Sequence, residues 1–178
     1  MQFLFSLLIP VILFVIDKFL NSPNFHKVFM RGDRNLNNYM MDGQMQGSVL
    51  KDLRKAIDGE HDAICCYEVL VNQAPDEKIK KRILEILNDE IRHYEMFSHI
   101  YFCLTGQHYS PQKQTTCPPT YKEGINHAFH DEQETVDFYH EMARKIHDPW
   151  ISHAFSDAAS DEQNHAVWFL YFMLIYHR

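Results

Sequence analysis

The feature that most constrains this chain is a pattern of glutamate and histidine that occurs twice along it. Each copy begins with one glutamate and continues, 30 positions later, with a glutamate followed at the third position by a histidine (90 − 60 = 30 and 162 − 132 = 30). The six residues are Glu60, Glu90, His93, Glu132, Glu162 and His165. One Glu-x-x-His on a helix is a weak indication of a metal site. Two copies in register with two further glutamates are a strong one.

Apolar residues at helical spacing accompany each member of the pattern. Around Glu60, for example, the stripe includes Leu53 and Ile57. Helix-start residues add to these stripes, since Pro75 suits the first turn of the second helix and Asp148 is the predicted N-cap of the fourth. The predicted helices span about residues 48–72, 75–105, 121–147 and 149–176.

The connections between these helices predict the topology. The second and fourth helices each follow a connection of only a few residues, so each pair forms an antiparallel hairpin. The middle connection, from about Gly106 to Thr120, is long enough to cross the length of a bundle, because an extended chain advances roughly 3.3 Å per residue. One long crossover between two hairpins is the ferritin-like arrangement. We therefore expect an all-α, antiparallel four-helix bundle with one long crossover.

The six residues of the pattern lie where a plain bundle places leucine. An unpaired buried carboxylate costs several kcal/mol, so four of them facing one another need a partner. Two divalent cations would balance four carboxylates, and the i, i+3 spacing lets the glutamate and histidine of one helix face the same site. Oxygen-rich ligation with one imidazole per metal favours iron or manganese over zinc or copper. The expected cofactor is a pair of metal ions, iron first and manganese second.

At these residues the chain resembles the ferritin-like di-iron carboxylate family, in particular its rubrerythrin-like and bacterioferritin-like members, over about residues 48–176. The sequence DEIRH at residues 89–93 also resembles the signature of di-iron oxygenases. The resemblance assigns each residue of the pattern a role. It implies that Glu60 and His93 are terminal ligands of one metal, that Glu132 and His165 serve the other, and that Glu90 and Glu162 bridge the pair.

The resemblance also implies supporting residues around the metals. Asp89 and Asp161 would hydrogen-bond the ligand histidines across the bundle, and Tyr67 and Tyr139 would donate to ligand carboxylates. The alternative for the aspartates is ordinary solvated helix charge, and the alternative for the tyrosines is simple core packing. Arg92 is interpreted as a surface or salt-bridging residue.

The resemblance implies a di-iron oxidoreductase of the rubrerythrin-like peroxidase or ferroxidase type that reacts with peroxide or O2. Two departures leave the reaction open. Thr135 stands where rubrerythrins usually carry an additional glutamate, and no rubredoxin domain is present, so a peroxidase would need an external electron donor. The first alternative is a non-catalytic protein on the same scaffold, which either handles iron or serves as a coat or envelope component. The second alternative is a di-iron oxygenase.

The four cysteines are Cys65, Cys66, Cys103 and Cys117, and none are spaced as Cys-x-x-Cys. This spacing excludes a zinc ribbon or a rubredoxin-type iron site. Cys65 and Cys66 are interpreted as small core or boundary residues, and a reducing, cytoplasmic compartment is the default.

The N-terminal segment, residues 1–20, is strongly apolar and is predicted to be a helix, followed by a linker at 21–46 and the bundle at 47–178. The apolar run is short for a membrane span, so three interpretations stay open: a short membrane anchor, an interfacial helix, or a helix buried against a partner subunit. A homodimer is expected from the resemblance. Nucleic-acid binding is not expected, because the formal net charge is −7 and no basic stripe is present.

Overall fold

The computed structural model describes residues 43–111 and 116–176, with only the backbone for residues 43–46. This part of the chain consists of four helices joined by irregular connections, and it contains no strand. The helices are α3 (Gly43–Gln73), α4 (Glu77–Thr105), α5 (Tyr121–Lys145) and α6 (Pro149–Tyr176).

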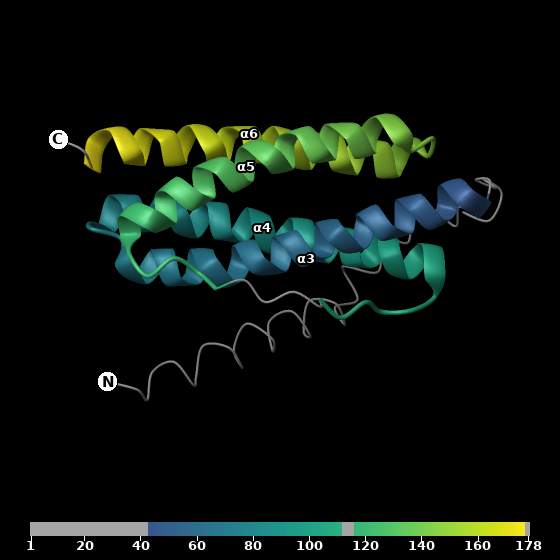
Figure 1. Ribbon diagram of the computed structural model, residues 1–178, viewed down its shortest axis with the longest axis horizontal. Helices are drawn as coiled ribbons and strands as arrows, with labels where there is room; N and C mark the ends of the chain where they lie inside the picture. Colours follow the sequence, from purple (N-terminus) through teal and green to yellow (C-terminus); the bar gives the residue numbers. More distant parts are fainter. Residues whose placement is uncertain (1–42, 112–115, 177–178) are drawn as a thin grey trace. The chain divides into compact units, whose positions relative to one another are not determined.

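The four helices form two antiparallel hairpins that pack as a bundle (Figure 1). Short connections join α3 to α4 and α5 to α6, whereas the connection between the hairpins extends from residue 106 to residue 120. The prediction of an all-α, ferritin-like bundle with one long crossover is therefore confirmed.

Local hydrogen bonds decide where several helices begin. Asp76 is the N-cap of α4, because its side chain accepts hydrogen bonds from the backbone N–H groups of Lys78 and Ile79. Pro75 consequently lies before the helix and not in its first turn as predicted. Asp148 caps α6 as predicted, since its Oδ1 accepts from the backbone N–H groups two and three residues later.

Two predicted helix boundaries differ from the observed ones. α3 begins at Gly43, five positions before the predicted start (48 − 43 = 5), so the last residues of the predicted linker at 21–46 are helical. α5 ends at Lys145 instead of residue 147, because Ile146 is extended and the cap of the next helix follows at once. The predicted apolar helix at 1–20 and the linker up to residue 42 lie outside the described residues. Among the described helices, none combines the length and the apolarity required to cross a membrane.

The apolar core consists of two clusters that are separated along the bundle by the six residues of the repeated pattern. Phe97, Tyr139 and Phe155 belong to the cluster on one side, and Ile83 and Phe169 belong to the cluster on the other. The polar layer thus lies inside a bundle that is otherwise closed by apolar packing.

A disulfide between Cys66 and Cys117 joins α3 to the crossover across a sequence separation of 51 residues. Cys66 is a half-buried boundary residue as predicted, but it is also disulfide-bonded, which its sequence position did not indicate, because the folded crossover returns Cys117 to it. Cys65 and Cys103 are free and exposed. Disulfides are rare in reducing compartments, so this bond counts against the reducing compartment that served as the default.

Candidate metal centre

The six residues of the repeated pattern meet in one buried layer, and none is more than 4% exposed. They form two overlapping groups of four residues. Within each group, one ligand-type atom from every residue lies within 4.8 Å of those of the other three. One group contains Glu60 and His93, the other contains Glu132 and His165, and both include Glu90 and Glu162. This is the arrangement expected for two neighbouring ions that share two carboxylates. Metal ligation by these residues stays a prediction.

The two halves of the site have nearly the same geometry. His93 Nδ1 lies 3.0 Å from Glu162 Oε1 and 3.4 Å from Glu90 Oε2. His165 Nδ1 lies 3.0 Å from Glu90 Oε1 and 3.0 Å from Glu162 Oε2. The sequence repeat therefore corresponds to an approximate twofold symmetry in space.

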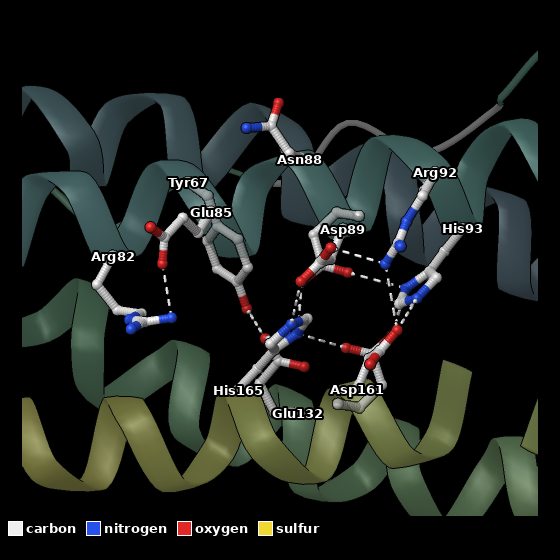
Figure 2. A network of polar contacts seen from close by, with 12 residues as sticks. Tyr67, Arg82, Glu85, Asn88, Asp89, Arg92, His93, Glu132, Asp161 and His165 are labelled. Atoms are coloured by element: carbon white, nitrogen blue, oxygen red, sulfur yellow. Dashed lines mark hydrogen bonds and ion pairs between the residues drawn. The ribbon is translucent and has the colours of Figure 1, made fainter. Parts of the chain in front are cut away.

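An aspartate from the opposite hairpin orients each histidine (Figure 2). His93 Nε2 lies 3.2 Å from Asp161 Oδ2, and His165 Nε2 lies 3.3 Å from Asp89 Oδ2. Such an aspartate favours the tautomer with the proton on Nε2, which leaves the Nδ1 lone pair free to face the centre of the site. The predicted positions of both aspartates across the bundle agree with this geometry.

The two tyrosines also cross between the hairpins. The Tyr67 hydroxyl donates to Glu132 Oε1 at 2.6 Å, and the Tyr139 hydroxyl donates to Glu60 Oε1. Both tyrosines are buried. Each hydroxyl fixes one of the two glutamates that the groups do not share.

Arg92 connects the two aspartates, a role that its sequence position did not reveal. Its Nη2 lies 2.7 Å from Asp89 Oδ1 and 3.3 Å from Asp161 Oδ2. Figure 2 draws both contacts as dashed lines. The interpretation of Arg92 as a salt-bridging residue is confirmed. The corresponding position of the second hairpin is Asn164 (92 + 72 = 164, as 90 + 72 = 162), so one guanidinium serves both halves.

The carboxylates strongly perturb one another. Burial raises the pKa of Glu60 well above its ordinary value, and the charge of Glu162 raises it further. The same two causes raise the pKa of Glu132. For Glu162, burial opposes ionisation, but the adjacent imidazoles of His165 and His93 hold its pKa well below the usual range. Burial and mutual repulsion thus oppose the ionisation of Glu60 and Glu132, and divalent cations would offset both effects.

Three buried polar atoms at the centre of the site test whether metal ions fit it. Glu90 Oε1, His93 Nδ1 and Glu162 Oε1 are inaccessible to water and make no hydrogen bond. His93 Nδ1 and Glu162 Oε1 are close, but they are not oriented as donor and acceptor. Buried polar atoms without partners are rare in proteins. A cation between these atoms would satisfy all of them, so the residues present fit a metal pair.

A cavity between α3 and α5 reaches the same layer. Its lining includes Glu60, Glu132 and Thr135, the residue that replaces the additional rubrerythrin glutamate. Glu134 also lines the cavity, but it belongs to neither metal-binding group. The cavity gives the carboxylates access to the surface on the side of α3 and α5.

Comparison with known proteins relates the chain to a sequence relative and to a solved structure. No family model matches the chain. The chain is 45% identical over 126 residues to the uncharacterized protein YhjR of Bacillus subtilis (strain 168), which covers 71% of this chain and 87% of YhjR. Its fold is similar to that of a ferritin-like, diiron-carboxylate protein from Bacillus anthracis str. Ames, with a TM-score of 0.65 and 17% identity over 75% of this chain and 99% of that chain. At 17% identity, this similarity shows a shared fold and nothing about a shared function.

Proposed function

This chain belongs to the same protein family as YhjR of Bacillus subtilis, and we propose that it is a di-iron protein whose metal pair reacts with peroxide or O2. One observation carries the proposal. Four carboxylates and two imidazoles converge in a buried layer in which polar atoms of three of them have no hydrogen-bond partner. The diiron-carboxylate description of the Bacillus anthracis neighbour adds support through the shared fold.

The donor set supports iron as the resident metal. Each group offers three carboxylates and one imidazole, with two carboxylates in common. Such oxygen-rich ligation suits iron or manganese, and two divalent ions neutralise the four carboxylates. When bound, the iron pair supplies the electrons that reduce peroxide or O2.

The residues of the chain prepare the site for that chemistry. Glu90 and Glu162 would hold both ions, while Glu60 and Glu132 would each hold one. Asp89 and Asp161 would keep the imidazole lone pairs directed at bound ions, and the tyrosine hydroxyls restrain the outer carboxylates. The apolar clusters on both sides exclude water from the layer except along the cavity.

Metal content and oxidation rate test the proposal together. The purified full chain is reconstituted with Fe2+ without oxygen, its iron is counted, and it is then mixed with H2O2 or with O2. We expect two irons per chain and rapid oxidation. Faster reaction with H2O2 supports a peroxidase, and faster reaction with O2 followed by mineral growth supports iron handling. A chain that binds no metal after reconstitution would contradict the proposal and leave a structural role.

A double substitution tests the bridging assignment. Glu90→Ala with Glu162→Ala removes both shared carboxylates, so the variant is expected to lose both irons. Glu85→Ala is the matched control, because Glu85 lies on α4 but its side chain pairs with Arg82 outside the site. Full iron content in the double variant would refute the assignment of bridging roles.

Partners form a separate part of the proposal. The last turns of α6 expose Val167, Leu170 and Leu174, which supports a homodimer that covers this face. Light scattering after gel filtration tests the homodimer, and a monomer at all concentrations would exclude it.

A peroxidase would also need an external electron donor. Membrane association through residues 1–20 is tested by co-sedimentation of the full chain with lipid vesicles.

A further inference from the structure

The cavity between α3 and α5 has a volume of about 470 Å³. Carboxylates of the candidate metal centre, including Glu60 and Glu132, line it. A water molecule occupies about 30 Å³ of liquid, so the cavity far exceeds the needs of peroxide or O2. Sites for small organic molecules occupy roughly 300–1,000 Å³. Its size is therefore that of a substrate site and not of a gas channel.

Gly59 helps to keep this cavity open. It lies in the interior of α3, where glycine is unfavourable relative to alanine, and it lines the cavity next to Glu60. Helix packing does not require this glycine, because an added Cβ would meet nothing within 4 Å. Gly124 differs, since a Cβ there would lie 2.6 Å from Leu70 Cδ1. Gly59 is exposed at the mouth of the cavity, so a larger side chain there has room to extend over it.

Three basic residues line the cavity at one end: Lys51, Arg54 and Lys55, all on α3. Lys55 Nζ lies 4.2 Å from the centroid of the Phe138 ring, which also lines the cavity. The Arg54 guanidinium lies 5.7 Å from the centroid of the Tyr101 ring. This end of the cavity would attract an anion and repel ferrous ions.

Acidic residues line the cavity nearer the level of the metal-binding layer. They are Asp58, which accepts a hydrogen bond from the Tyr109 hydroxyl at 3.1 Å, together with Asp131 and Glu134. Lys55 precedes Glu60 by five residues, or roughly 7.5 Å at 1.5 Å per helical residue. A ligand with an anionic end and a short carbon chain would match this separation, with its chain beside Ala56 and Gly59.

We propose that this cavity binds a small organic carboxylate, with its charged end at Lys51, Arg54 and Lys55 and its carbon chain beside Gly59, next to the metal pair. The inference rests on the proposed function because it names a substrate class for the same site. Binding of the carboxylate itself depends on the cavity. The two ideas can therefore fail separately.

The test is calorimetric titration of hexanoate into the full chain, after its iron content has been measured, with hexan-1-ol as the uncharged probe. We expect hexanoate to bind at least tenfold more tightly than hexan-1-ol. Two irons per chain without hexanoate binding would overturn this inference and leave the proposed function intact. Hexanoate binding to a chain that holds no iron after reconstitution would support this inference and contradict the proposed function.

Two variants locate the bound carboxylate. Gly59→Leu fills the cavity and is expected to weaken hexanoate binding at least tenfold. Gly47→Leu is its matched control, since Gly47 is an exposed residue of α3 whose added Cβ also meets nothing and which lies outside the cavity. Arg54→Ala with Lys55→Ala should weaken binding about tenfold at unchanged iron content. If hexanoate bound only to the iron-loaded chain, and both variants bound it as tightly as wild type, the carboxylate would be bound by the metals alone. That result would contradict the proposal.

Discussion

At the residue scale, the orientation of each imidazole depends on one carboxylate from the other hairpin. Asp161 is hydrogen-bonded to His93 and is held by Arg92. Asp161→Asn keeps the shape but removes the charge, so the variant is expected to bind iron about 10- to 100-fold more weakly. Competition with a chelator measures the affinity. Asp157→Asn, an exposed position on α6, is the control, and equal affinities of the two variants would exclude the orienting role.

Glu95 should make stability depend on pH independently of any metal. Burial raises the pKa of this α4 carboxyl from 4.5 to about 7. Between these values the unfolded chain releases the proton while the folded protein keeps it, so the carboxyl increasingly opposes folding as the pH rises from 4.5 to 7. The full shift corresponds to about 3 kcal/mol, and screening by water near this partly buried carboxyl reduces it, so Glu95→Gln should be more stable than wild type at pH 8 by about 1–3 kcal/mol and nearly equal at pH 4. Urea unfolding across this range measures the gap, and a gap independent of pH would contradict the explanation.

Most residues of the site could be predicted because the Glu and Glu-x-x-His pattern occurs twice in the sequence. The second copy shows that Glu60 and Glu132 are equivalent, although neither is followed at the third position by the histidine that marks Glu90 and Glu162. Arg92 could not be predicted in this way, because its counterpart is Asn164 and its second partner lies on another helix. The contact between Arg92 and Asp161 occurs in only one of the two halves, so the sequence repeat does not reveal it.

At the element scale, stripes of apolar residues predict the presence of a helix better than its ends. The stripe identified α3, but its start at Gly43 lies in a polar segment that carries no stripe. Asp148 was recognisable as a cap because a proline follows it. At Pro75 the same reasoning placed the helix start too early, since the aspartate after the proline is the cap. Side-chain hydrogen bonds to the backbone set these boundaries, and they become visible only in the folded chain.

The disulfide is a tertiary feature of two elements, and its contribution can be measured. Cys117→Ser releases the crossover from α3, which should lower the free energy of unfolding by about 2–4 kcal/mol. Cys65→Ser, at the adjacent exposed thiol, should change it little. Urea unfolding with and without dithiothreitol completes the comparison, because the reductant should lower wild type to the level of the Cys117 variant. A wild type that is insensitive to the reductant would argue against the bond.

At the scale of the whole molecule, the bundle follows from local patterns and the cavity does not. Helix number, order and pairing follow from stripes and loop lengths. The cavity depends on the separation of α3 and α5, which side-chain packing determines along the length of both helices. An oxygenase-like substrate site could therefore be named as an alternative from the sequence, but the space for a substrate could be found only in the folded chain.

The buried polar layer should make the stability of the whole bundle depend on metal. Without cations, burial and the charge of Glu162 oppose ionisation of Glu60 and Glu132. Two bound ions would remove this repulsion and satisfy Glu90 Oε1 and His93 Nδ1. A ligand at 100 times its Kd stabilises a fold by about 2.7 kcal/mol, and each kcal/mol shifts Tm by roughly 2–4 °C in a protein of this size.

Loading with Fe2+ or Mn2+ without oxygen should therefore raise Tm by about 5–10 °C for one such site and by more for two. Differential scanning calorimetry of the chelator-treated and reloaded chain measures the change. The variant with Glu90→Ala and Glu162→Ala should show no rise, whereas Glu85→Ala should respond like wild type. An equal rise in all three proteins would mean that the metal acts elsewhere on the chain. No rise in wild type would mean that the buried carboxylates are satisfied by protons and imidazolium alone.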